Sequence, residues 1–189
     1  MLIIKFQELF YSKFLKYSEE KMTIKPIHSK EWISVKKADS KLAHSLFDFR
    51  KTNDLFKQIL FALNNDNPNK QITALRFIRD DSFKDLELEI LTPVLINIAV
   101  NKNTDNSIFA RECLVSSAFN HDHIIREKLT SMFDDLLEST DQYIYKRLAE
   151  LLFFLNYKDL RKRLMEKCKN SKNKDIVNIY TKFTEKYDF

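Results

Sequence analysis

The chain has 189 residues, of which 44% are hydrophobic and 13% aromatic, which is too apolar for a disordered chain and enough for a packed core. It contains no glycine, which excludes glycine-dependent phosphate loops and disfavours a hairpin-rich β fold. The net charge of +5 is unevenly spread: residues 1–52 and 158–189 each carry +5, whereas residues 53–157 carry −5. Such asymmetry bears on the choice of partner rather than on the fold.

The cysteine usage and the hydropathy pattern indicate a cytoplasmic protein. Cys113 and Cys168 lie in apolar helical surroundings, with no further thiol at metal-ligand spacing, so we expect both to be reduced and buried. No apolar run is long enough to cross a membrane, and the first ten residues lack the pattern of a signal peptide. The sequence therefore predicts no membrane partner and no cofactor.

Apolar spacing predicts helices along the whole chain. Residues 2–19 form one amphipathic helix, residues 20–29 a break, and residues 30–51 one or two short helices. Pro68 suits a first helical position, and Pro93 predicts a kink within its helix. Because the chain has no glycine, we expect asparagine at the helix ends. The remaining predicted helices are 53–64, 69–79, 82–100, 104–119, 120–138, 140–155, 158–169 and 174–186.

A short phrase occurs twice, as TDNSIFAR at 104–111 and TDQYIYKR at 140–147, at an offset of 36 residues. A weaker copy 36 residues earlier puts Ile72 in the position of Ile108 and Ile144. A fixed period of this size is typical of stacked repeats, and short turns make neighbouring helices antiparallel. We therefore expect a stack of helical hairpins in which the three isoleucines form one buried ladder.

Residues 91–114 (LTPVLINIAVNKNTDNSIFARECL) resemble a HEAT repeat, which has a proline in its first helix, an aspartate in the turn and an arginine six residues later. Pro93, Asp105 and Arg111 occupy these positions, and the next unit repeats the last two as Asp141 and Arg147. The resemblance covers about residues 53–186. It implies pairing of an aspartate with an arginine of the neighbouring unit, such as Asp105 with Arg147.

For the fold, the resemblance implies an all-α chain: a right-handed α-solenoid of about three to four HEAT-like hairpins with an N-terminal helical extension. The extension would be residues 1–52, packed on a repeat domain of residues 53–189 as one compact domain. HEAT repeats also imply a surface for binding protein or, less often, nucleic acid, and they imply no catalysis. The pair of histidines at 121 and 123 has no third metal ligand at useful spacing, so no metal site is expected.

Two groups of residues are candidates for contact with a partner protein. One face of the helix at 140–155 has the mixed composition of an interface, although packing between repeats is the alternative: Tyr143, Lys146, Glu150 and Phe153. The other is an acidic cluster that either contacts a basic partner or forms a solvated face: Asp134, Asp135 and Glu138. A basic run near the C-terminus is either a phosphate-binding stripe or the polar face of a terminal capping repeat: Arg161, Lys162, Lys169 and Lys172.

These features favour a non-catalytic protein-binding module. A small stand-alone chain of this build resembles bacterial toxin-immunity proteins, which implies that it neutralises a cognate toxin by covering its active site. The acidic middle of the chain would attract a basic toxin surface. The alternatives are a nucleic-acid-binding protein built like the HEAT-repeat DNA glycosylases, and an adaptor subunit of a larger complex that docks through residues 1–52.

Overall fold

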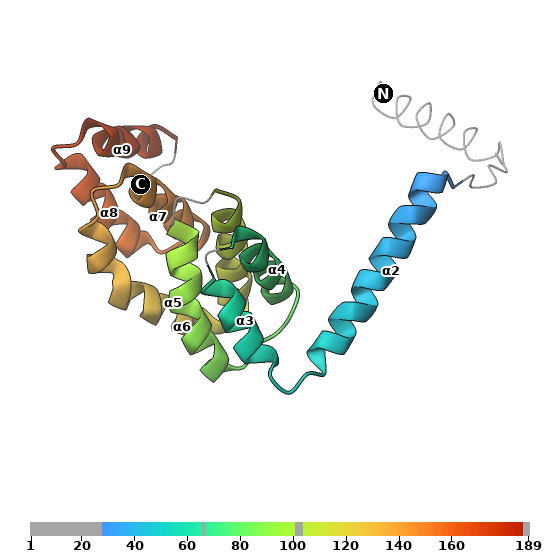
Figure 1. Cartoon of the computed structure of the whole chain (residues 1–189). Helices are drawn as coiled ribbons and strands as arrows, with labels where there is room; N and C mark the ends of the chain where they lie inside the picture. Colours follow the sequence, from blue (N-terminus) through green and yellow to red (C-terminus); the bar gives the residue numbers. More distant parts are fainter. Residues whose placement is uncertain (1–27, 66, 101–103, 187–189) are drawn as a thin grey trace, which may run out of the picture. The chain divides into compact units, whose positions relative to one another are not determined.

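The structure is a computed structural model that describes residues 28–65, 67–100 and 104–186. These residues form eight α-helices and no strand, which confirms the predicted all-α class (Figure 1). The chain divides into two compact units, Met1–Asp48 and Phe49–Phe189. All the repeated segments belong to the second unit.

The described part of the first unit is a single helix. α2 (Lys30–Arg50) is continuous, where the sequence allowed one or two shorter helices. Ser29 caps its start, because its hydroxyl accepts a hydrogen bond from the backbone N–H of Trp32 at 3.1 Å. None of the 21 residues of α2 is buried. The helix predicted at 2–19 lies outside the described residues.

The second unit contains seven helices in its described residues: α3 (Leu55–Leu63), α4 (Pro68–Arg79), α5 (Asp85–Val100), α6 (Thr104–Leu137), α7 (Gln142–Phe154), α8 (Lys158–Lys169) and α9 (Lys174–Lys186). The bounds of α8 and α9 match the predicted ones, and Pro68 occupies the first turn of α4 as expected. α5 continues through Pro93. α7 begins two residues later than predicted, at Gln142, because Asp141 caps it by accepting from the N–H of Tyr143 at 2.9 Å.

α6 has a kink at His121, whose backbone angles (φ −132°, ψ 36°) are not helical. The sequence placed a helix boundary at this point, and the two predicted helices are the two halves of α6. Two contacts, one from α5 and one from the residue that precedes α8, are made next to the kink. The His121 ring nitrogen Nδ1 lies 2.8 Å from Asp85 of α5, and the Tyr157 hydroxyl donates to the Asp122 carboxylate at 2.7 Å.

Asparagine takes the place of glycine at the tightest described turn. Asn156, between α7 and α8, has φ 57° and is the one described residue in the left-handed region. The backbone N–H of Asn156 donates to the carbonyl of Phe153, and that of Tyr157 donates to the carbonyl of Leu152, both at 3.1 Å. This pair of bonds satisfies carbonyls left free at the end of α7. The prediction that asparagine serves at helix ends is confirmed here.

The expected isoleucine ladder is wrong. Ile108 is 42% exposed, and Ile72 and Ile144 are only half-buried. The 36-residue period nevertheless holds in the core, where the buried equivalents are Phe77, Cys113 and Ala149. They lie five residues after the isoleucines, which is about 140° further round the helix. The repeated phrase therefore identifies helices that contribute to the core, but its isoleucines do not lie on the buried face of those helices.

Candidate functional site

Contacts between residues whose sequence separation is close to 36 place three helical segments next to one another: α4, the first half of α6 (residues 104–120) and α7. The side-chain amide of Asn106 donates to Gln71 at 2.8 Å, and the Cys113 thiol donates to the carbonyl of Leu75 at 3.2 Å, joining α4 to α6. On the other side, Arg111 of α6 forms an ion pair of 2.6 Å with Glu150 of α7. α6 thus has α4 on one side and α7 on the other.

The outward side of these helices exposes large apolar residues. Ile108, Val115 and Phe119 share one face of α6, because they are separated by 7 and 4 residues, and they are 42%, 36% and 90% exposed. Tyr143 and Phe154 share one face of α7 and are 54% and 62% exposed. The spacing of Tyr143 and Phe154 equals that of Ile108 and Phe119. We call these five residues the α6–α7 face.

Neighbouring contacts fix the direction of this face. Beside Ile108, the ring of Phe109 points toward α4, since the guanidinium groups of Arg76 and Arg79 lie 5.4 and 5.6 Å from its centre. On the opposite side, Arg111 points toward α7. Ile108 therefore lies between the two inter-helix contacts and faces solvent.

Glu150 is the central charge of the α6–α7 contact. Arg147 is 8% exposed, and burial, followed by the nearby Arg111 guanidinium, lowers the pKa of Arg147 from its ordinary value. Glu150 and then Asp141 oppose this shift, and Glu150 is the carboxylate that also pairs with Arg111. Asp105, which the HEAT resemblance pairs with Arg147, is exposed. That pairing stays a prediction, whereas the ion pair that the structure shows between the two copies of the repeat is Arg111–Glu150.

The predicted interface on α7 is therefore only partly at the surface. Tyr143 and Lys146 are exposed as expected, whereas Glu150 is held by Arg111. Phe153 is half-buried, with the guanidinium of Arg161 5.8 Å from its ring centre. The exposed ring is that of Phe154. Val115, Phe119 and Phe154 were not among the predicted contact residues. Their spacing from Ile108 on α6 and from Tyr143 on α7 was the signal that could have found them.

Two of the three residues of the acidic cluster form ion pairs with basic residues of α8. Asp134 of α6 lies 2.6 Å from Arg163 of α8, and Glu138 lies 3.3 Å from Lys167. Both pairs advance by four residues, so the two helices present matching rows of opposite charge. Asp135 is exposed. The acidic cluster is therefore an exposed face whose charge is partly paired with α8, which weakens its predicted role as a contact for a basic partner.

The basic residues proposed for nucleic acid are divided between the core and the surface. Arg161 is 8% exposed and therefore cannot lie in an open phosphate-binding stripe. Lys162, Lys169 and Lys172 are exposed. The Lys169 ammonium lies 5.8 Å from the ring centre of Tyr180 in α9, a distance at which the ring face attracts a cation. Three of the four candidates thus remain at the surface.

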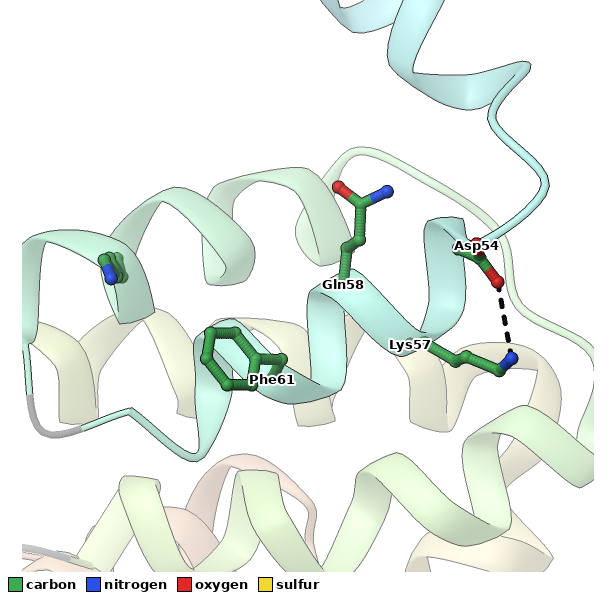
Figure 2. A pocket seen from close by; sticks show the side chains of 5 residues that line it. Asp54, Lys57, Gln58 and Phe61 are labelled. Atoms are coloured by element: carbon green, nitrogen blue, oxygen red, sulfur yellow. Dashed lines mark ion pairs between the residues drawn. The ribbon is translucent and has the colours of Figure 1, made fainter.

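One pocket lies along α3, and Figure 2 shows four of its residues. Asp54 and Lys57 form an exposed ion pair of 3.3 Å, and Phe61 is 70% exposed. Gln58 and Lys70 complete the lining. An exposed ion pair of this kind is worth little energetically, and the pocket combines no nucleophile with a base. We assign no chemistry to it.

The described residues offer no other site of recognisable chemistry. They contain no group of three or more His, Cys, Asp and Glu side chains placed to hold a metal ion. Burial raises the pKa of the Cys113 and Cys168 thiols to about 12, so neither is an activated nucleophile. None of the described helices has the length and apolar content needed to cross a membrane. No family model, curated protein or solved structure matches this chain.

Proposed function

We propose that the chain is a non-catalytic protein-binding module with the build of a HEAT-like right-handed solenoid of three to four hairpins. The support for the build is the sequence separation of its inter-helix contacts. Asn106–Gln71, Cys113–Leu75 and Arg111–Glu150 join residues 35, 38 and 39 positions apart. Contacts close to the 36-residue period are expected where successive copies of one unit stack on each other.

The α6–α7 face is the proposed binding surface. Single exposed apolar residues are ordinary, but five on matching faces of two adjacent helices are typical of an interaction site. Aromatic residues dominate such sites because they bury much area at a small cost in conformational entropy. Three of the five, Phe119, Tyr143 and Phe154, are aromatic. This cluster is the observation that carries the proposal.

More specifically, we propose that the partner is a cognate bacterial toxin in the cytoplasm, neutralised when the α6–α7 face covers its active site. The support is the resemblance of residues 91–114 to a HEAT repeat together with the small size of the chain. A rigid apolar face can cover an active site without any chemistry of its own, which fits a purely steric inhibitor.

The test compares partner capture by the wild-type chain and by the double variant Phe119→Asp/Phe154→Asp. Both side chains are mostly exposed, so the substitutions leave the core intact while placing charge at the centre of the face. We expect the partner's affinity to fall about 100-fold or more, as for interface hot spots. Phe61→Asp in α3 is the matched control, because this ring is also exposed and lies outside the face.

The captured partner is then purified and assayed for toxicity with and without the chain. The immunity proposal requires that the wild-type chain and Phe61→Asp suppress the toxic activity and that the double variant does not. Protein binding itself is contradicted if the double variant retains every partner of the wild type. Nucleic-acid binding would appear instead as retained duplex whose affinity falls steeply with salt and depends on Lys162, Lys169 and Lys172.

A further inference from the structure

The charges of the second unit are segregated between two groups of helices. α4, the first half of α6 and α7, which form the surface with the α6–α7 face, carry six Lys/Arg against three Asp/Glu. α5 and residues 122–137 of α6 carry two Lys/Arg against seven Asp/Glu. The negative charge of the middle of the chain therefore belongs to α5 and the second half of α6. The expectation of a basic partner, drawn from that charge, does not describe the α6–α7 face.

Ion pairs within α4, the first half of α6 and α7 engage two of their three carboxylates. Glu150 is engaged by Arg111, and Glu112 lies 3.5 Å from Arg79, which also contacts Asp80 at 2.9 Å. Arg111, Arg79 and their carboxylates thus neutralise one another. Three exposed cations of these helices lie outside the pairs, Lys70 and Arg76 of α4 and Lys146 of α7, and none forms an ion pair with a carboxylate of the described residues. Lys70 lines the α3 pocket, which leaves Arg76 and Lys146 near the α6–α7 face, and the exposed carboxylate in the first half of α6 outside the pairs is Asp105.

The two cations flank the apolar residues. Arg76 lies on the α4 side, where its guanidinium covers the ring of Phe109 next to Ile108. Lys146 follows Tyr143 by three residues, so both lie on the same side of α7. Arg76 and Lys146 therefore lie at the same end of the α6–α7 face as Ile108 and Tyr143. Phe119 and Phe154 lie 11 residues further along their helices, at the opposite end of the face.

We propose that the α6–α7 face takes an acidic amphipathic segment of the partner protein. Apolar side chains of the segment pack between Ile108, Phe119 and Phe154, and one or two of its carboxylates pair with Arg76 and Lys146. Complementary charge at the edge of an apolar contact speeds encounter and fixes the register of the bound segment. This inference rests on the proposed protein-binding function and specifies the chemistry of the partner at that site.

The test uses two fluorescein-labelled amphipathic peptides of equal length with the same leucine and phenylalanine positions. One carries glutamate and the other lysine at every polar position. Fluorescence anisotropy with the full chain should show the glutamate peptide binding at least about tenfold more tightly, with a preference that shrinks as salt rises. Arg76→Glu/Lys146→Glu should remove or invert the preference. The control is Lys57→Glu/Lys162→Glu, on α3 and α8. It changes the net charge by the same amount and should retain the preference for the glutamate peptide.

The results separate this inference from the function on which it rests. Equal or tighter binding of the lysine peptide overturns the inference, and so does an absence of glutamate-peptide binding at about 1 mM. If Phe119→Asp/Phe154→Asp abolishes partner binding while Arg76→Glu/Lys146→Glu leaves it unchanged, the face is a protein-binding site but its partner segment is not acidic. If Phe119→Asp/Phe154→Asp retains the partner, the proposed function itself fails.

Discussion

Removing the charge of Glu150 should destabilise the protein more than removing its partner Arg111. In Arg111→Met, the loss of a 2.6 Å charge-assisted hydrogen bond is partly offset, because one of two neighbouring guanidinium groups disappears. In Glu150→Gln, Arg111 loses its ion-pair partner and the buried Arg147 loses one of the two nearby carboxylates that favour its charged form. We expect a cost of about 1 kcal/mol for Arg111→Met and about 3 kcal/mol for Glu150→Gln.

The assay is urea unfolding followed by circular dichroism, with the double variant included so that a double-mutant cycle isolates the coupling. The double variant should cost less than the two single variants together, because Arg111→Met already removes the ion pair that Glu150→Gln would break. Glu138→Gln is the control: its pair with Lys167 is 3.3 Å long and largely exposed, so its loss should cost less than about 1 kcal/mol. The reasoning is refuted if Arg111→Met costs as much as Glu150→Gln.

Three further predictions follow from the described contacts. Asn156→Ala should lower the free energy of unfolding by about 1 kcal/mol, whereas Asn156→Gly should keep or raise it, since φ 57° suits glycine; equal thermal midpoints would contradict this. Cys113 and Cys168 should resist Ellman's reagent at pH 8 until urea unfolds the chain. With folded pKa values of about 12 against about 9 unfolded, they retain their full contribution to stability below pH 9 and lose it progressively from there toward pH 12, which pH-dependent urea titration measures. Asp134→Asn should cost less than about 1 kcal/mol, and about 1 M NaCl should diminish the difference, because the pair with Arg163 is exposed; an undiminished cost would indicate a buried role.

Local features were predictable where the sequence contains helix caps, helix breakers or clear apolar spacing. The bounds of α8 and α9, the proline at the start of α4 and the boundary within α6 follow from caps, breakers and apolar spacing. The role of Asn156 follows from the absence of glycine, since asparagine is the next residue to tolerate a left-handed turn. Helix formation over short stretches depends mainly on neighbours in sequence, which explains these successes.

The direction of each helical face was not predictable in the same way. Ile108, Ile72 and Ile144 are as apolar as core residues, and the sequence repeats them at the right interval. Which side of the helix is covered depends on where α4, α5 and α7 lie, and the covered side contains Phe77, Cys113 and Ala149 instead. Amphipathic patterns alone cannot distinguish a core stripe from an exposed binding stripe when both are apolar.

The sequence by itself determined that this protein is helical, that a short phrase recurs at an interval of 36 residues and that the charge is uneven along the chain. The tertiary structure decided what the charges and apolar residues do. It pairs Asp134 with Arg163, buries Arg161 over Phe153, and leaves Phe119 and Phe154 at the surface. These outcomes depend on contacts between different helices, such as the pair of Asp134 with Arg163, and such contacts are set by the packing of whole helices, which local spacing does not encode.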